Sequence, residues 1–273
     1  MGRALNTAQR VGMNILARGM RSLMRANPAQ GYFCVGADTS FFEWDGMRFI
    51  YHFDQYGVGS NIDSGGNTET ATRGKLISLL KPNSVFFDIG AHEGLYAISV
   101  KKSLPQSVVH AFEPQPDALL RNLELNGIEA KVHNIALGDR AGVVAMTQDK
   151  RSSNHISESG VQVEMVTLDA LLQRGSIPPP DAIKIDVEGF ELQVLRGARN
   201  TLEKFRPFVI TEINECFQRY HSSLRELFDY MRQNGFQAHA LRDGSLRPIM
   251  TTVETLSDLP PSDDFNYWWI PYQ

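Results

Sequence analysis

The sequence predicts an α/β fold, in which a doubly wound, mostly parallel sheet of seven strands carries helices on both faces. From residue 84 onward, short apolar runs alternate with longer stretches in which apolar residues recur at helical spacing. The runs are apolar throughout, which is typical of parallel strands that are covered on both faces. The chain has 273 residues, 42% of them hydrophobic, which is enough for a core of this size.

Each element is placed by a local pattern. Apolar runs bounded by turn-forming residues predict strands, and apolar residues three or four positions apart predict helices. Strands are expected near residues 84–89, 107–112, 129–135, 182–186, 207–212, 235–241 and 266–272. Helices are expected at 69–80, 94–103, 116–126, 190–204 and 221–234. Asn67 or Thr68 is the expected cap of the first helix, and Pro82 follows its end.

The alternation of strand and helix breaks between residues 142 and 170. Two further apolar runs, GVVAMT and VQVEMVTL, flank the polar segment QDKRSSNHISES there. We expect these runs to form two extra strands, inserted after the third strand of the sheet.

Residues 1–65 are predicted to form an N-terminal extension to a main domain at 66–273. Residues 1–26 contain five arginines and no acid, and their apolar residues fall near helical spacing. A basic amphipathic helix of this kind can lie on an anionic membrane or act as a transit peptide. It can also pack on the domain with its arginines in water, which we favour because the apolar stripe is modest.

A hairpin is expected within the same extension. Aromatic-rich runs at 41–53 flank Asp45 and Gly46, and Asp-Gly is the two-residue signal for a hairpin turn. The following segment, 55–67, is rich in Gly, Ser and Asn and is expected to be a loop.

Composition and charge argue against a nucleic-acid-binding, disulfide-rich or membrane-spanning protein. The net charge is −4, so nothing in the whole chain favours nucleic acid as a partner. Two cysteines, Cys34 and Cys216, do not make a disulfide framework, so we expect a cytoplasmic protein. No apolar run reaches the roughly 18 residues of a membrane helix, and the N-terminus lacks the compact apolar core of a secretory signal.

The stretch VFFDIGAHEGLY places an acid and two glycines at the end of a buried strand. Asp88 ends the apolar run, and Gly90 and Gly94 follow it. In open parallel sheets, ligands bind beyond the carboxyl ends of the strands, and glycines let the backbone approach a ligand closely. The dinucleotide fingerprint G-x-G-x-x-G is absent, and Glu93 would repel a pyrophosphate there. The pattern therefore favours a ligand that has a cationic end and no phosphate.

S-adenosylmethionine is such a ligand, because it carries an ammonium, a sulfonium and a ribose but no phosphate. The acid that binds a ribose is expected at the end of the second strand, about 20 residues further on. Glu113 lies there, 19 residues after Gly94. A carboxylate that accepts both ribose hydroxyls makes two charge-assisted bonds, each worth about 1.5–3 kcal/mol. The alternative for Glu113, a surface acid that caps the helix after Pro114, is less favoured once Asp88 and the glycines are considered.

Several blocks of the sequence, in order, resemble the FkbM family of S-adenosylmethionine-dependent methyltransferases. The blocks are VFFDIGAHEGLYA, HAFEPQP, NIALGDRAG (134–142), VTLDAL (166–171), IKIDVEGFELQVLRGA (183–198) and ITEINE (210–215). The resemblance implies a class I, Rossmann-like methyltransferase fold for the main domain. Two departures from the family pattern could tune the fit of the substrate. His92-Glu93 stand where the family commonly has an Asn and an apolar residue, and Phe190 stands where it often has a His.

The resemblance also implies which residues bind the cofactor. These are Asp88, Gly90, Ala91, His92, Glu93, Gly94, Glu113, Pro114, Asn134, Ala136 and Asp186. Asp88 and the glycine loop would hold the methionine end, and Glu113 the ribose. Asn134 and Ala136 would lie beside the adenine, although Asn134 is equally well explained as a turn residue before ALGD.

Asp186, Glu188 and His155 are the candidate catalytic residues. KIDVEGFE puts two acids at the end of the fourth strand, where alternation would bring both to one side if the strand continues. A hydroxyl acceptor needs a base or a metal to take its proton, and with Glu212 these acids could also hold Mg²⁺. Glu188 could instead cap the next helix. His155 lies in the polar insertion, which is expected to overhang the acceptor, although a lone loop histidine is more often a surface residue.

The sequence therefore predicts an enzyme that moves a methyl group from S-adenosylmethionine to oxygen. The FkbM resemblance implies an acceptor hydroxyl on a sugar, glycolipid, polysaccharide or secondary metabolite. The alternatives are a methyltransferase that acts on nitrogen, an NAD-dependent dehydrogenase and a binding module without catalysis.

Overall fold

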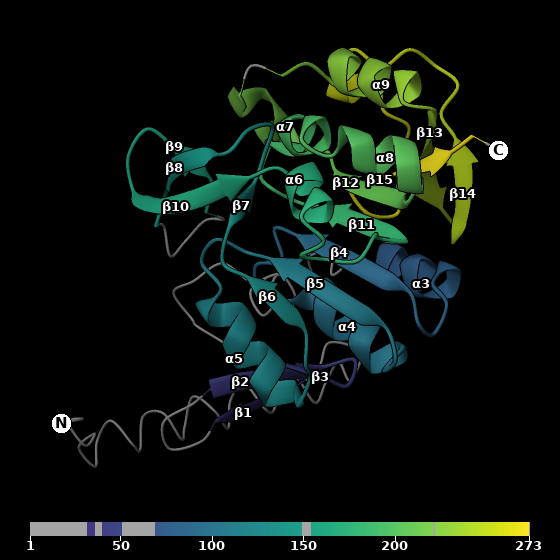
Figure 1. Ribbon diagram of the computed structural model, residues 1–273. Coiled ribbons are helices and arrows are strands. Elements are labelled where there is room, and N and C mark those ends of the chain that lie inside the picture. The colour runs from purple at the N-terminus through teal and green to yellow at the C-terminus, as the bar shows by residue number, and fades with distance from the viewer. Residues whose placement is uncertain (1–31, 36–39, 51–68, 149–153, 221, 273) are drawn as a thin grey trace. The chain divides into compact units, whose positions relative to one another are not determined.

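The computed structural model describes residues 32–35, 40–50, 69–148, 154–220 and 222–272 (Figure 1). The chain divides into two compact units, Met1–Thr68 and Glu69–Gln273. The helix predicted within 1–26 and the loop predicted at 55–67 lie outside the described residues.

A three-stranded antiparallel sheet belongs to the first unit. Its strands are β1 (Tyr32–Val35), β2 (Ser40–Trp44) and β3 (Met47–Ile50). Asp45 and Gly46 join β2 to β3 with φ values of 50° and 69°. Two successive positive φ values are those of a type I′ turn, whose twist matches the flanking strands. The predicted hairpin is therefore confirmed.

An eight-stranded sheet forms the centre of the second unit, in the order β14-β13-β15-β12-β11-β4-β5-β6 (Figure 1). The strands are β4 (Val85–Ile89), β5 (Val108–Phe112), β6 (Lys131–His133), β11 (Ala182–Ile185), β12 (Phe208–Glu212), β13 (Phe236–Arg242), β14 (Ser245–Pro248) and β15 (Asn266–Pro271). From β12 to β6 every neighbouring pair is parallel. β15 lies antiparallel between β12 and β13. The predicted doubly wound, mostly parallel sheet is confirmed.

The sheet contains one strand more than the seven that were predicted. β14 pairs antiparallel with β13 at the edge of the sheet. Asp243 and Gly244, with φ values of 51° and 69°, form the turn between them. This is the same Asp-Gly signal that predicted the hairpin at Asp45-Gly46, so the sequence contained the evidence for the eighth strand.

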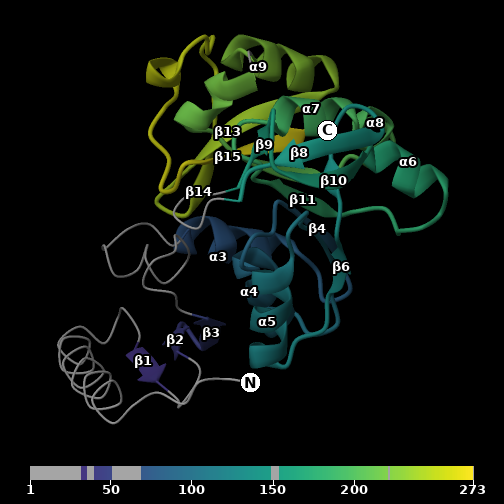
Figure 2. The same cartoon turned by 90° about the vertical axis from the view of Figure 1, so that its left-hand side faces the viewer.

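Helices cover both faces of the sheet (Figure 1 and Figure 2). They are α3 (Thr70–Leu79), α4 (Leu95–Ser103), α5 (Asp117–Asn126), α6 (Leu168–Gln173), α7 (Glu191–Arg196), α8 (Arg199–Phe205) and α9 (Leu224–Gln233). The predicted cap of α3 is wrong, because Glu69 holds the N-cap position. The single helix predicted at 190–204 is two helices, and the break lies where Gly197 meets the carbonyl of Gly138. A Cβ at Gly197 would lie 1.9 Å from that oxygen.

The pleat of the central strands sorts their side chains between two faces. Phe87 and Ile89 of β4 join Ile183 and Ile185 of β11 in the core that packs under α7, α8 and α9. Lys184 lies opposite Asp88 in the parallel pairing of β11 with β4. Because alternate residues of a strand point to opposite faces, the charged pair lies on the side away from that core.

A second, four-stranded sheet follows the order β7-β10-β8-β9. Its strands are β7 (Ala136–Leu137), β8 (Gly142–Met146), β9 (Ile156–Ser157) and β10 (Val161–Val166). β8 and β10 confirm the two extra strands expected in this insertion. The hydroxyl of Tyr220 donates to the carbonyl of Ile156 at 2.9 Å, which fixes β9 to the 3-10 helix η2 (Glu215–Tyr220).

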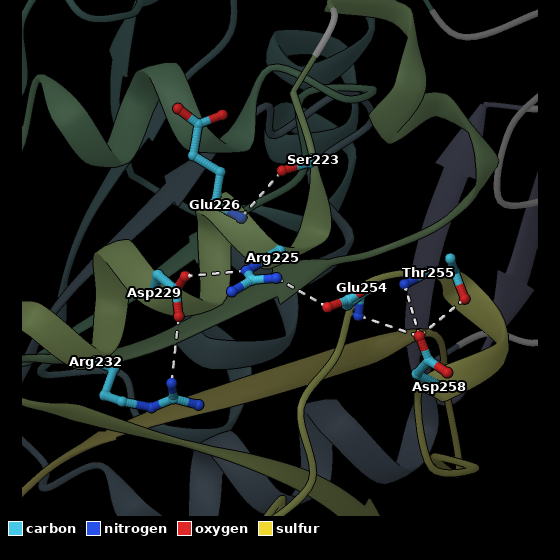
Figure 3. Close-up of polar contacts among 8 residues, drawn as sticks. All are labelled: Ser223, Arg225, Glu226, Asp229, Arg232, Glu254, Thr255 and Asp258. Atoms are coloured by element: carbon cyan, nitrogen blue, oxygen red, sulfur yellow. Dashed lines mark hydrogen bonds and ion pairs between the residues drawn. The ribbon is translucent and has the colours of Figure 1, made fainter.

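The exposed face of α9 carries a chain of ion pairs (Figure 3). The guanidinium of Arg225 lies 2.9 Å from the carboxylate of Glu254 and 3.7 Å from that of Asp229, which also pairs with Arg232. Exposed pairs of this kind contribute about 0–1 kcal/mol each. We therefore regard this face as solvated surface.

Candidate active site

Two of the predicted acids lie at the same edge of the sheet. Asp88 is the fourth residue of β4, and Glu113 directly follows β5, the parallel neighbour of β4. One carboxylate oxygen of Glu113 accepts a hydrogen bond from the backbone N–H of His92, and the other from that of Gln115, both at 2.9 Å. Glu113 is thus held beside the loop that follows Asp88.

The loop after β4 depends on glycine for a close approach between strands. The N–H groups of Gly90 and Ala91 donate to the carbonyl of Phe112 at 2.9 and 3.3 Å. Gly90 has a φ of 77°, and a Cβ there would lie 1.8 Å from the backbone oxygen of Asp186. Only a residue without a side chain permits this packing of the loop against the end of β11. Gly94, with a φ of 87°, is the N-cap of α4.

Asp88 is a buried acid, and its polar neighbours do not fully offset the effect of burial on its pKa. Its side chain is 3% exposed, and Oδ2 accepts the N–H of Ala97 in α4 at 2.9 Å. Burial raises the pKa of Asp88 to about 7, although Lys184 and the hydrogen bond from Ala97 oppose this rise. A cation brought close to Asp88 would stabilise its ionised form.

The ends of β5 and β6 lie side by side. Asn134 follows β6, and its side-chain amide donates to the carbonyl of Pro114, the residue after Glu113. Ala136 starts β7 two residues later, and its side chain is buried. At the start of α4, the carbonyl of Glu93 accepts from the side chain of Asn122 at 2.9 Å. The residues predicted for the ribose and the adenine therefore border one another.

A lysine that the sequence analysis did not consider lies among the acids. Lys184 of β11 is fully buried, and it lies between Asp88 of β4 and Ile210 of β12 in the pairing of the strands. Its Nζ lies 3.0 Å from Oδ2 of Asp186 and 5.1 Å from the ring centroid of Tyr96. A charged residue inside the apolar strand AIKI was the signal, because lysine is almost never buried without a partner.

Asp186 and Glu212 form a pair of carboxyls beside this lysine. Burial raises the pKa of Glu212 to about 10, and the charge of Asp186 is the second cause. Burial also pushes the pKa of Asp186 upward, but Lys184 and the hydrogen bond with Glu212 outweigh it and hold this pKa below its ordinary value. These opposite directions favour, at neutral pH, a protonated Glu212 beside an ionised Asp186, next to the buried Lys184 cation.

Glu69 is a further acid of this cluster that the sequence analysis missed. The hydroxyl of Tyr96 donates to its Oε2 at 2.5 Å, and the side-chain amide of Asn266 donates to the same oxygen. Glu69 holds a φ of 53°, in the left-handed region. A helix was expected from residue 69, and Glu69 was given no role.

The strand does not continue to Glu188, so the condition for strand alternation to bring Glu188 and Asp186 to one side is not met. β11 ends at Ile185, and Glu188 takes a φ of 56° in the turn that follows. Its carboxylate hydrogen-bonds the thiol of Cys216, and its carbonyl accepts from Arg219 at 2.9 Å. Strand alternation holds only while the chain stays extended.

Glu191 holds the turn in place of Glu188. Its Oε1 accepts the N–H groups of Val187 and Gly189, each at 3.1 Å, in the turn before α7. The N-cap of α7 is Phe190 and no side chain caps the helix, so the alternative that Glu188 caps it is wrong. The Glu191 side chain is 2% exposed, and burial raises its pKa to about 7.

The two candidate histidines lie in different parts of the unit. His155 lies in the insertion, where its N–H donates to the hydroxyl of Thr147 at 3.0 Å. Lys184 of β11, Asp186 directly after β11 and Glu212 of β12 lie together at the central sheet, whereas the catalytic role of His155 stays a prediction. His92 lies in the loop after β4, and its charge helps to lower the pKa of Asp186.

Within the ranges that the structure describes, no group of three His, Cys, Asp or Glu side chains could hold a metal ion. Asp186, Glu188 and Glu212 are therefore not among the described groups that could hold Mg²⁺, and the Lys184 ammonium lies 3.0 Å from Asp186. None of the helices in the described part of the chain combines the length and the apolarity needed to cross a membrane.

Comparison with known proteins gives one family. The family model described as "Methyltransferase FkbM domain" matches residues 88–238. The chain is 30% identical over 147 residues to the hexuronic acid methyltransferase AglP of Haloferax volcanii, a match that covers 51% of this chain and 59% of that protein. It is 30% identical over 166 residues to the 2-O-methyltransferase NoeI of Sinorhizobium fredii, with coverages of 52% and 68%.

A third relative is the 31-O-demethyl-FK506 methyltransferase FkbM of Streptomyces tacrolimicus. The chain is 26% identical to it over 203 residues, which cover 60% of this chain and 76% of that protein. The matched part thus spans about three fifths of AglP and larger shares of the other two relatives.

Proposed function

Because the chain belongs to the FkbM methyltransferase family, we propose that it transfers a methyl group from S-adenosylmethionine to a hydroxyl oxygen. The observation that carries this proposal is the pair of acids, Asp88 and Glu113, at neighbouring strand ends on either side of a glycine loop. β15, antiparallel between β12 and β13, completes the sheet of class I, Rossmann-like methyltransferases.

The charges around the loop fit a cationic, phosphate-free cofactor. Glu69, Asp88, Asp186 and Glu212 lie near one another, and Lys184 is the cation among them. Even with Glu212 protonated, negative charge exceeds positive charge there. An ammonium and a sulfonium are therefore attracted, whereas a pyrophosphate is repelled.

Each part of the cofactor has a set of residues that would hold it. Gly90, Ala91 and Gly94 let the backbone approach the methionine end, and Asp88 acts on it through its charge. Each Glu113 oxygen accepts one backbone N–H and keeps a lone pair for a ribose hydroxyl. Asn134 borders the same place and would lie next to the adenine. When bound, S-adenosylmethionine supplies an electrophilic methyl group, whose bond to sulfur breaks with its electron pair left on sulfur.

The acceptor is proposed to be a hydroxyl on a sugar, a glycolipid, a polysaccharide or a secondary metabolite. The names of the relatives support this class, since they specify a hexuronic acid, a 2-O-methylation and a 31-O-demethyl precursor. A hydroxyl is a poor nucleophile until a base takes its proton. Asp186 is ionised, and its side chain is 27% exposed, so it can receive that proton.

The first experiment measures cofactor binding by calorimetry, with S-adenosylmethionine and NAD compared side by side. We expect heat from S-adenosylmethionine only; binding of NAD alone would refute the proposal and favour a dehydrogenase. The second experiment measures transfer of a labelled methyl group to hexuronic acids, other glycans and hydroxylated small metabolites. Transfer only to amine-bearing acceptors would favour methylation of nitrogen.

A further inference from the structure

We propose that Lys184 is a positioning residue that holds Asp186 and Glu212 as two carboxyls sharing one proton, and that Asp186 takes the proton of the acceptor hydroxyl. This inference rests on the methyltransferase function proposed above. In the step, the O–H bond of the acceptor breaks and its proton bonds to Asp186. The electron pair of that bond stays on the acceptor oxygen, which becomes the nucleophile.

Burial separates the roles of the two residues. Lys184 is fully buried, so it cannot touch an acceptor. Asp186, whose side chain is 27% exposed, places one oxygen 3.0 Å from the Lys184 ammonium and still reaches the surface. Lys184 therefore acts through Asp186, and it fixes the direction of the carboxylate.

The backbone fixes the same carboxylate from the other side. The N–H of Asp186 donates to the carbonyl of Ile89 at 2.9 Å, and its own carbonyl packs against Gly90. These contacts tie the proposed base to the loop that would hold the cofactor. The alignment of base and methyl donor can supply much of the rate enhancement of such a reaction.

The charges that face Lys184 come from every element packed against it. They are Glu69 before α3, Asp88 on β4, Asp186 after β11 and Glu212 on β12, with Tyr96 of α4, Asp264 before β15 and His92 nearby. Burial alone would lower the pKa of Lys184, but Asp186, Glu69 and Glu212 outweigh it and keep the side chain charged. The ammonium in turn keeps a second proton off the pair.

Removing the Lys184 ammonium should shift the pKa values of Asp186 and Glu212 in the same direction. Lys184 lowers the pKa of Asp186 and opposes the rise in that of Glu212. Without it, both pKa values rise, and the pair binds its second proton at a higher pH. A doubly protonated pair cannot accept the proton of the acceptor. Loss of activity should therefore be larger at lower pH and should diminish as the pH rises.

The experiment compares Lys184→Met with the matched control Arg73→Met. Arg73 is also a buried cation, but its guanidinium donates to the hydroxyl of Ser99. We expect kcat of K184M to fall about 100-fold at neutral pH, with the acid limb of its pH profile moved upward. R73M should keep the wild-type profile whatever its stability. A K184M profile that matches the wild type in shape would overturn the proposal.

A spectroscopic measurement tests the pair without turnover. At a pH about two units above the pKa values of Asp88 and Glu191, where those two carboxyls are ionised, infrared spectra of the wild type should still contain the band of a protonated carboxyl, and Glu212→Gln should remove it. The isosteric E212Q substitution keeps a hydrogen-bond donor toward Asp186, so it covers the case in which K184M fails to fold. Absence of the band in the wild type would overturn the shared proton.

Calorimetry separates this proposal from the one on which it rests. K184M should still bind S-adenosylmethionine, because Glu113 and the glycine loop are unchanged, but more weakly than the wild type, because Lys184 holds down the pKa of Asp88. Wild-type protein that neither binds S-adenosylmethionine nor transfers a methyl group would refute the proposed function. Wild-type transfer with an unchanged K184M pH profile would refute only the role of Lys184.

Discussion

Gly90→Ala tests the contact that joins the cofactor loop to the end of β11. A Cβ at this position would lie 1.8 Å from the backbone oxygen of Asp186, whereas real Cβ atoms essentially never come within 3.0 Å of a neighbour. Relief of the clash requires β4 and β11 to separate locally by about 1.2 Å, the difference between these two distances. Gly127→Ala is the matched control, because Gly127 also has a positive φ, of 62°, but nothing lies within 4 Å of its Cβ position.

The two variants share one cost and differ in another. A non-glycine residue in left-handed backbone lowers the unfolding free energy by about 1–2 kcal/mol, and this loss applies to both variants. Forcing extra volume into packed structure typically lowers the unfolding free energy by about 1–3 kcal/mol more, and this loss applies only to G90A. We expect G127A to lose about 1–2 kcal/mol of unfolding free energy and G90A about 2–5 kcal/mol.

The assay combines urea unfolding with calorimetry and steady-state kinetics. G127A should bind S-adenosylmethionine like the wild type. G90A should bind it at least about tenfold more weakly, and because a displacement of about 1 Å can cost 100-fold in rate, its kcat should fall by about that factor. Equal stability and equal cofactor affinity in the two variants would refute the close approach of Gly90 to Asp186.

Three further predictions address charge. Glu113→Gln should weaken S-adenosylmethionine binding about 10- to 100-fold in calorimetry, because a charge-assisted bond is worth about 1.5–3 kcal/mol; the exposed Glu124→Gln is the control, and equal losses would contradict a ribose contact. Burial raises the pKa of Glu212 from 4.5 to about 10, so stability present below pH 4.5 is lost as the pH rises toward 10. Relative to E212Q, the wild type should lose roughly 1 kcal/mol per pH unit in that window, and parallel stability curves would count against a protonated Glu212. Arg225→Ala should change the unfolding free energy by less than about 1 kcal/mol, because its ion pairs are exposed; a loss of several kcal/mol in thermal unfolding would show that this face is not merely solvated.

Local patterns in the sequence determined the layout of the fold. The apolar runs that end at Ile89, Phe112 and Ile185 became neighbouring parallel strands, because uninterrupted apolar runs are stable only when both faces are covered. Once these strands were assigned, the acids and glycines of DIGAHEG and HAFEP could be placed together, because the carboxyl ends of neighbouring parallel strands meet at one edge of the sheet. The eighth strand was within reach as well, because Asp243-Gly244 is an ordinary hairpin signal.

Only the tertiary structure decided which charges meet and in which protonation state. Glu69, Lys184 and Glu212 are far apart in the sequence, and no local pattern brings them together. The strand ends at Ile185 and Glu188 takes a left-handed φ of 56°, so strand alternation does not relate it to Asp186. The proton on Glu212 depends on burial and on partners contributed by other strands. Local propensity is encoded in neighbouring residues, whereas desolvation and Coulomb interaction arise from distant segments that pack together, so only the fold sets them.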